Sequence, residues 1–430
     1  MFESVATAAV LKKYPLPARP SSHHLSAAAP SIKIATTERE KEEIYRLRYQ
    51  VYIDEMHGGT RHTEADNRSQ QLHDAWDDRA HHFYIEQDGV VAACARVNLR
   101  QDGSFECEEH FDMEEFKPSF PNHVCMTSRL VLHPKLRGSH LLKQLTCGMY
   151  RFMLERQLRY NFIDCHPQLL PLYSRLGFQL YRPGFNHQKY TYVVPMVLVI
   201  NDLCHLDRVK SPFVAEARRL GYSSSPAIPV SWSGSQSRRI ETPAGMHTDQ
   251  ATDPSCLSDE FVYMADAELF EDLTAEEAKT LVSLGHVISC RAGDSVLNPG
   301  DPGREIFLIL SGSFQVQGPA LRTSTGEVKV LKILAAGETF GEIRFLRDEL
   351  RYATVKAREN STLLILNAKA LDRLITTGPR IAAKVFRNIA RIVSTRLSDK
   401  VRFVRFSPSP RRVHYVASPF DPGREKQTLS

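Results

Sequence analysis

A stretch near the middle of the chain, residues 207–258, is rich in serine, proline, glycine and threonine and includes the run SSSPAIPVSWSGSQSRRIETPAG. Such a composition cannot build a packed core and is typical of a linker. It predicts two folded units, residues 31–206 and 259–400, in a chain of 430 residues that is too long for one ordinary core. We expect residues 1–30 and 401–430 to be flexible tails.

The overall composition is that of a globular protein, with 42% hydrophobic and 24% charged residues. The formal net charge of +5 is small for this length and does not indicate a nucleic acid or membrane partner. No apolar run approaches the roughly 20 residues that cross a bilayer, and no secretory signal is evident. The sequence therefore predicts a cytoplasmic protein without a transmembrane segment.

The second unit begins with a short helix for which Thr274 and Glu277 form a predicted capping box. Short strand-like runs follow at close spacing: DSVLNPG, EIFLILSGSFQVQG, EVKVLKILAAG and ATVKARENSTLLILN. Glycine, aspartate and proline separate them, which predicts an antiparallel barrel or sandwich. An amphipathic helix over residues 369–400, broken near Gly378, closes the unit.

Residues 340–357, FGEIRFLRDELRYATVKA, contain the most informative pattern in the second unit. A Gly-Glu turn follows one strand, an arginine precedes the next, and a helix-like stretch between them offers free backbone N–H groups. An arginine, N–H donors and a carboxylate together suit a phosphodiester and the sugar beside it. An ordinary bulge loop with a surface ion pair is the alternative interpretation.

The same segment resembles the phosphate-binding cassette of cyclic-nucleotide-binding domains, and the resemblance continues upstream in RAGDSVLNPGDPGREIFLILSGSFQV. It implies an antiparallel β-roll (jelly roll) with flanking helices and cyclic AMP as effector. Glu342 would bind the ribose hydroxyl and Arg351 the cyclic phosphate. The rest of the implied pocket consists of Gly341, Ile343, Tyr352 and Ala353. No DNA-binding module follows the closing helix, so we expect no DNA partner.

The first unit alternates helical and strand-like patterns. Residues 43–56 form a predicted amphipathic helix, and residues 81–103 a hairpin with a QDG turn. A strand, a basic turn containing Lys135, Arg137 and Gly138, and a long helix follow. Backbone N–H groups at such a helix start, together with basic side chains, can hold a pyrophosphate.

The order of these motifs resembles the GNAT acyltransferase superfamily, whose central motif corresponds to LHPKLRGSH and whose later Y-x-x-x-G-F motif runs from Tyr173 to Phe178. The resemblance implies a mixed sheet flanked by helices, so the whole chain is predicted to be α+β. It places Tyr173 as a candidate general acid. The implied acyl-donor site consists of Arg129, Leu130, Val131, Leu132, Lys135, Arg137, Gly138 and Ser139.

The start of the unit resembles acyl-homoserine lactone synthases and N-acyl amino acid synthases. The shared features are Arg48 four residues before Tyr52, acidic residues in the next loop, and two strand arginines, Arg96 and Arg129. Thr127 stands where the lactone synthases commonly have Glu, which favours the amino acid synthases. The resemblance implies substrate binding by Arg48 and Arg96, and catalytic roles for Glu64, Asp66 and Asp74. Structural ion pairs and surface carboxylates are the alternatives.

The sequence therefore predicts an N-acyltransferase that moves an acyl group from a pantetheine thioester to an amine and is regulated by cyclic AMP bound to a second domain. The donor would be an acyl carrier protein or coenzyme A, the acceptor an amino acid or other amine, and no metal is expected. One alternative is a cyclic-AMP-regulated protein lysine acetyltransferase that uses acetyl-coenzyme A. Another is a non-catalytic nucleotide sensor.

Overall fold

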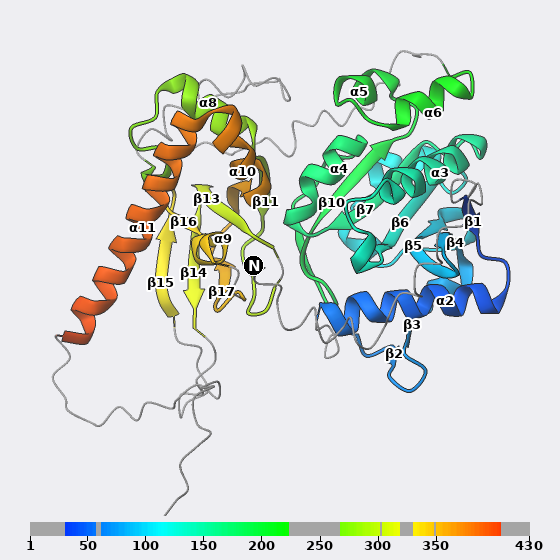
Figure 1. Ribbon diagram of the computed structural model, residues 1–430, viewed down its shortest axis with the longest axis horizontal. Coiled ribbons are helices and arrows are strands. Elements are labelled where there is room, and N and C mark those ends of the chain that lie inside the picture. The colour runs from blue at the N-terminus through cyan, green and yellow to red at the C-terminus, as the bar shows by residue number, and fades with distance from the viewer. Residues whose placement is uncertain are drawn as a thin grey trace, which may run out of the picture.

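The computed structural model describes residues 31–56, 62–222, 267–301, 303–318, 330–347 and 350–405, and only the backbone of residues 399–405. It forms two lobes, one from each predicted unit (Figure 1). The predicted tail at residues 1–30, residues 223–258 of the predicted linker and residues 406–430 lie outside the described residues. No helix in the described ranges is long and apolar enough to span a membrane.

The first lobe is built on an eight-stranded sheet in the order β1-β4-β5-β6-β7-β10-β8, with β9 paired to β10. Every pairing is antiparallel except that of β6 with β7, so the sheet is mixed, as predicted. The strands are β1 (Ile32–Ile34), β4 (Ala80–Gln87), β5 (Val90–Leu99), β6 (Val124–Leu132), β7 (Tyr160–Cys165), β8 (Gln179–Leu180), β9 (Phe185–His187) and β10 (Thr191–Val199). A separate hairpin pairs β2 (Ala65–Asp66) with β3 (Gln71–Leu72).

Helices cover both faces of this sheet because alternate strand residues point to opposite sides. Phe83 and Ile85 of β4 pack in the cluster that contains α3 (Leu141–Glu155). Tyr84, between them, packs with α2 (Glu38–Tyr49) on the other face. The predicted helix over residues 43–56 is in fact α2 followed by a π-helix, η1 (Gln50–Glu55). α4 (Leu170–Leu176) ends at Gly177, which has a φ of 110°.

The first domain extends beyond Leu206, where the sequence placed its end. Two short helices follow, α5 (Leu203–Arg208) and α6 (Phe213–Arg219). Phe213 is buried and its ring stacks on that of Tyr150 in α3, with 4.4 Å between centroids. The start of the predicted linker is therefore helical, because its apolar residues are buried against α3.

The second lobe contains two four-stranded antiparallel sheets, β11-β18-β13-β16 and β12-β17-β14-β15, which confirms the predicted β-roll. The capping box at α8 and the break between α10 and α11 are also confirmed. The strands are β11 (His286–Cys290), β12 (Ser295–Leu297), β13 (Glu305–Ser311), β14 (Ser313–Gln317), β15 (Val330–Ala335), β16 (Thr339–Phe340), β17 (Thr354–Ala357) and β18 (Ser361–Asn367). The helices are α8 (Ala275–Ser283), α9 (Glu342–Leu346), α10 (Ala368–Thr377) and α11 (Pro379–Arg405).

The two lobes are in direct contact, with α4 and β10 of the first lobe facing the second (Figure 1). Asn186 forms two 2.9 Å hydrogen bonds with the backbone of Ser295, one to its N–H and one to its carbonyl. At another point, Asn367 at the start of α10 donates to the carbonyl of Gln168 at 3.3 Å. These contacts place the start of α10 beside the segment that leads into α4.

Candidate functional site

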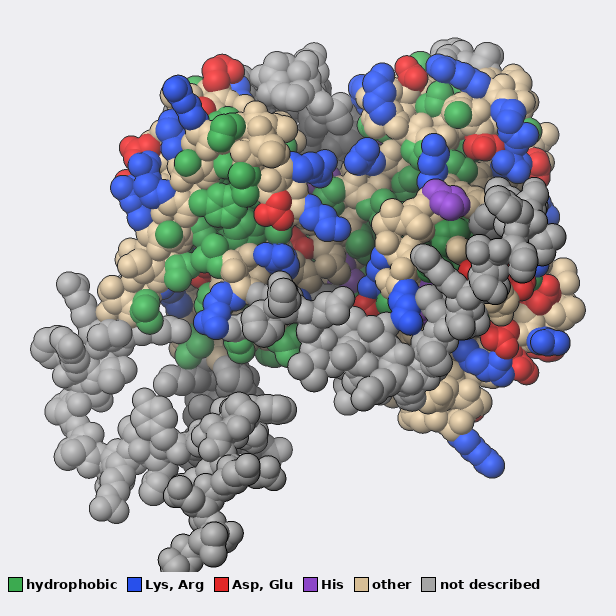
Figure 2. Space-filling model, viewed as in Figure 1, with side chains coloured by type: hydrophobic (Ala, Val, Ile, Leu, Met, Phe, Trp, Pro, Cys, Tyr) green, Lys and Arg blue, Asp and Glu red, His purple; other side chains and the backbone are tan. Residues whose placement is uncertain are grey.

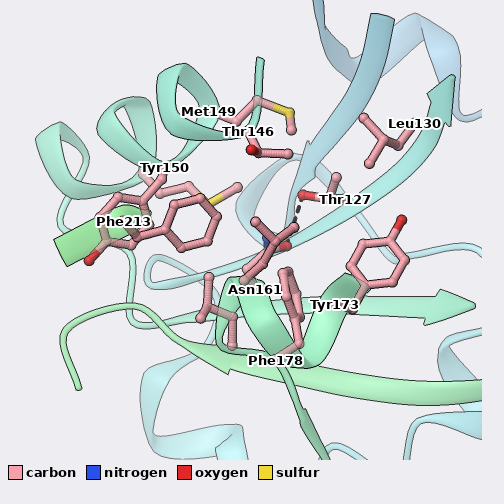
Figure 3. A pocket seen from close by; sticks show the side chains of 12 residues that line it. Thr127, Leu130, Thr146, Met149, Tyr150, Asn161, Tyr173, Phe178 and Phe213 are labelled. Atoms are coloured by element: carbon pink, nitrogen blue, oxygen red, sulfur yellow. Dashed lines mark hydrogen bonds between the residues drawn. The ribbon is translucent and has the colours of Figure 1, made fainter. Parts of the chain in front are cut away.

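The first lobe opens where β6 and β7 separate. Their parallel pairing covers Val124–Met126 of β6, and Thr127 then donates from its hydroxyl to Asn161 at 3.0 Å (Figure 3). Beyond this point β6 pairs only with β5. The resulting edge of β6 lines a cavity of about 780 Å³, which Asp164 and Cys165 of β7 also line. A strand edge without a neighbour offers backbone donors and acceptors to a ligand.

Seven of the eight predicted donor-binding residues line this cavity: Arg129, Leu130, Val131, Leu132, Arg137, Gly138 and Ser139. Lys135 does not. Arg137 is held by Glu55 of the π-helix in a two-point ion pair of 2.5 and 2.7 Å. Arg129 has a φ of 54° and sits at a bulge in the β5–β6 ladder, a conformation that costs energy in a non-glycine residue. The predicted donor site is thus largely brought together.

Two acidic residues that the sequence analysis did not single out, Glu106 and Asp164, also line the cavity. Burial, with Glu106 nearby, raises the pKa of Asp164 to about 6. Burial also opposes ionisation of Glu106, but Arg129 and Arg96 outweigh it and lower the pKa of that carboxyl. In the sequence, the one indication of a role for Asp164 is that it is a carboxyl in the otherwise mostly apolar strand YNFIDC. A carboxyl with a pKa near 6 is suited to proton transfer near neutral pH.

Three buried polar atoms of cavity-lining residues lack hydrogen-bond partners among the described residues: the hydroxyl of Tyr190, Nη1 of Arg129 and Oε1 of Glu305. The first two are hydrogen-bond donors. The guanidinium of Arg129 also lies over the rings of Tyr52 and Tyr190, 5.4 Å from each centroid. Buried polar groups are ordinarily satisfied, so unpaired donors beside a cavity indicate a place for an acceptor group of a ligand.

Arg48 and Arg96, the predicted substrate-binding residues, are buried, paired with carboxylates and not among the residues that line the cavity. Arg48 donates to Asp77 at 2.7 Å, and neither side chain is more than 1% exposed. Arg96 pairs with Asp74 at 2.5 Å and with Glu106 at 2.8 Å. Burial opposes ionisation of Asp74, but Arg96 and Arg129 lower its pKa below its usual range. These residues form a structural network under the cavity, which is the alternative that the sequence left open.

The predicted catalytic residues are divided between the cavity and other places. Tyr173 lines the cavity, and burial raises its pKa well above the ordinary value, so its hydroxyl stays protonated. Asp74 belongs to the network above. Glu64 pairs with Lys189 at 2.9 Å and is not a lining residue. Asp66 lies on the exposed β2–β3 hairpin, where it accepts from the Ser69 hydroxyl at 2.6 Å, so it is not at the site.

A small apolar pocket adjoins the cavity, and Thr127, Leu130 and Tyr173 line both. Figure 3 shows it enclosed by α3, α4, β6 and the ring of Phe213 from α6. Its free volume is only about 20 Å³. Its lining is almost entirely apolar, and this allows it to take a hydrocarbon chain if its walls move.

The cassette in the second lobe begins at Gly341, the residue before α9, with a φ of 89°. A Cβ there would lie 2.7 Å from the carbonyl of Glu305 and 2.8 Å from Arg351, so only glycine fits. Arg351 is buried and donates to the carbonyl of Gly341 at 2.8 Å and to the Glu305 carboxylate at 3.2 Å. Glu342, which follows Gly341, and Arg351 are the two side chains predicted to bind the nucleotide, and both lie at this turn.

The remaining cassette residues differ in exposure. Glu342 is buried and accepts a hydrogen bond from Arg396 of α11 at 2.5 Å, and Arg396 also donates to the carbonyl of Thr339. Ile343 and Tyr352 are exposed, and Ala353 is half-buried. In the described parts of the chain, no cluster of three or more His, Cys, Asp or Glu residues is placed to hold a metal ion.

Comparison with known proteins divides the chain in the same way. Residues 43–201 match the family model described as N-acyl amino acid synthase FeeM, and residues 287–377 match that of the cyclic nucleotide-binding domain. The likeness to N-acyl amino acid synthases therefore lies in the first lobe, and the likeness to cyclic nucleotide-binding domains lies in the second.

Individual relatives match one part of the chain each. Glutaminase 1 of Bradyrhizobium diazoefficiens is 30% identical over 31% of this chain and 21% of its own length. The cyclic AMP receptor protein of Thermus thermophilus is 28% identical over 36% of this chain and 69% of its own. Among solved structures, a CoA-dependent acyl-homoserine lactone synthase is similar at 17% identity, with a TM-score of 0.35, over 46% of this chain and 92% of that one. The chain thus spans about a fifth of the length of the first of these relatives.

Proposed function

We propose that this protein transfers an acyl group from a pantetheine thioester to the amine of an amino acid, and that a cyclic nucleotide in the second domain controls the reaction. The observation that carries the proposal is the cavity between β6 and β7. It combines an open strand edge, a pair of unpartnered donors and two carboxyl groups within a domain that matches the FeeM family model.

An amino acid acceptor fits the charges at this cavity. Its carboxylate would accept hydrogen bonds from Nη1 of Arg129 and the hydroxyl of Tyr190, the two unpartnered donors. Its ammonium group would face Glu106 and Asp164. This arrangement gives partners to the two unsatisfied donors, and an acceptor without a carboxylate would leave Arg129 and Tyr190 unsatisfied.

The chemistry follows from the same residues. The bound ammonium first loses one proton to solvent. The neutral nitrogen then attacks the thioester carbonyl carbon, a C–N bond forms and the C–S bond breaks. One amine proton passes to the carboxylate of Asp164, and the hydroxyl of Tyr173 supplies a proton to the departing thiolate. Backbone N–H groups on the free edge of β6 would stabilise the carbonyl oxygen as it gains charge.

The apolar pocket beside the cavity is the proposed site of the acyl chain. We expect Met149→Ala, which enlarges this pocket from α3, to raise kcat/KM for longer acyl donors relative to shorter ones. A series of saturated donors from acetyl to palmitoyl measures the preference, with Met113→Ala, a buried methionine outside the pocket, as control. A preference for acetyl donors in both wild type and variant would instead favour an acetyltransferase.

The direct test of the proposed reaction is to incubate the full chain with long-chain acyl carrier protein or acyl-coenzyme A and each amino acid. Mass spectrometry detects N-acyl amino acids, with and without cyclic AMP. Product formation that requires both substrates supports the proposal. Absence of product with every combination of donor and amino acid would refute it.

Arg351→Ala is expected to weaken cyclic AMP binding by at least about tenfold, because a charge-assisted contact to the phosphate is lost from a buried site. Isothermal titration calorimetry on the full chain measures the effect. Arg358→Ala, which removes an exposed arginine of the same domain, is the control and should bind like wild type. Equal affinity in all three proteins would show that the nucleotide does not bind at Arg351.

A further inference from the structure

One wall of the cavity between β6 and β7 comes from the second domain. Arg304 comes from the loop before β13, Glu305 from β13 itself and Arg344 from α9, whereas α10 contributes Lys369 and Asp372. Three of the five Lys and Arg residues that line the cavity therefore belong to the nucleotide-binding domain. Figure 2 shows basic side chains on both sides of the groove between the lobes.

The basic turn of the first domain is poorly placed to hold a phosphate alone. The two-point ion pair with Glu55 already occupies the guanidinium of Arg137. Lys135 does not line the cavity. An anionic group that reaches this end of the cavity must therefore find its positive charge elsewhere.

The second-domain wall offers that charge. Arg304 and Lys369 are exposed and line the cavity, and Arg304 donates one hydrogen bond from Nη2 to the carbonyl of Phe345 at 3.1 Å. Of the two carboxylates in this wall, Glu305 is already paired with Arg351 at 3.2 Å, which leaves Asp372 against the three basic residues. The wall is thus positive and faces the free edge of β6 across the cavity.

We propose that Arg304 and Lys369 bind the phosphate of the donor's phosphopantetheine arm, so that both domains form the donor site. The inference rests on the proposed function, which places the thioester at β6. This phosphate is common to carrier-protein and coenzyme A donors, so the same residues serve either. A donor without it loses the contact to the second domain.

The same wall is connected to the nucleotide site. Arg344, on the cassette helix α9, donates to the carbonyl of Gly303 at 2.7 Å. Glu305 lines the cavity and also contacts Arg351. A cyclic phosphate that draws Arg351 toward itself changes the partner of Glu305 and thereby the charge of the donor wall.

Calorimetry on the full chain with 4′-phosphopantetheine and with pantetheine tests the binding site without any need for turnover. We expect wild type to prefer the phosphorylated compound, and Arg304→Ala/Lys369→Ala to weaken its binding by about tenfold or more while pantetheine binding is unchanged. Lys279→Ala, which removes a half-buried lysine on α8, is the matched control. Equal affinity of wild type and the double variant for 4′-phosphopantetheine would overturn the inference.

Acyl-transfer kinetics distinguish a failure of the proposed phosphate site from a failure of the proposed reaction. With acyl-4′-phosphopantetheine, acyl-coenzyme A and acyl carrier protein, the double variant should raise KM about tenfold, whereas KM for acyl-pantetheine should not change. Normal KM values for every donor in the double variant would refute the phosphate site and leave the acyltransferase intact. Binding of 4′-phosphopantetheine without any acyl transfer would support the site and refute the reaction.

Discussion

Asp164→Asn is expected to lower kcat by about 10²- to 10⁴-fold and to leave the KM for the acyl donor nearly unchanged. The substitution keeps the size of the side chain but removes the group that accepts the amine proton. Asp164 lies on β7 at the cavity, opposite Pro195 of β10, where a proline provides no backbone N–H to the sheet. Steady-state kinetics on the purified full chain measure the effect, and the melting temperature shows whether the variant is folded.

The pH dependence provides an independent check on the same residue. The carboxylate form of Asp164 is the active one, and its pKa is about 6. The kcat of wild type should therefore fall as the pH drops below about 6, and this decrease should be absent in the Asn variant. Asp112→Asn, at a half-exposed carboxylate that pairs with Arg182, should retain both the wild-type rate and its pH profile. A wild-type rate for Asp164→Asn would exclude Asp164 as the general base.

Arg48→Met should destabilise the protein by about 3 kcal/mol or more, because it leaves Asp77 buried without its closest cation. Typical domains have only about 5–15 kcal/mol of stability, so we expect a large fall in melting temperature. Asp77 would retain Arg96 at 3.2 Å, which limits the loss. Thermal and urea unfolding of the full chain, followed by circular dichroism, measure the change.

Arg46→Met on the same helix is the matched control. Arg46 pairs with Glu42 and Glu43 at the surface, with 43% of its side chain exposed. Surface ion pairs contribute roughly 0–1 kcal/mol, so this variant should unfold close to wild type. Equal stability of the two variants would mean that the Arg48–Asp77 pair contributes no more than a surface contact.

The sequence predicted well wherever a local pattern has one physical outcome. The capping box of Thr274 and Glu277 forms as predicted because both hydrogen bonds lie within one helical turn. The glycine of the Y-x-x-x-G-F motif, Gly177, lies at the end of α4 in the left-handed conformation that glycine adopts most easily. The β-roll follows from the spacing of its strands and turns, and the order of the cassette residues 340–357 places Glu342 and Arg351 around one turn.

Site residues whose roles depend on distant partners were harder to assign. Arg48, Arg96 and Arg129 have the same side chain and all face inward, but only Arg129 retains an unpartnered nitrogen at the cavity. Arg48 instead pairs with Asp77, which is 29 residues away in sequence and is brought beside it only by folding. The sequence alone does not indicate a catalytic role for Asp164, because a single carboxyl in a strand becomes reactive only through its surroundings.

The sequence by itself determined the two-domain organisation, the type of each fold and the residues of the cassette. These properties follow from composition, periodicity and short motifs, whose partners are near in the chain. Only the tertiary structure decided which charged groups are satisfied inside the protein and which face the cavity. It also placed Arg304 and Lys369 beside the edge of β6, more than 170 residues away in sequence. The charge of a cavity is a sum over residues brought together by packing, and local sequence patterns do not contain that sum.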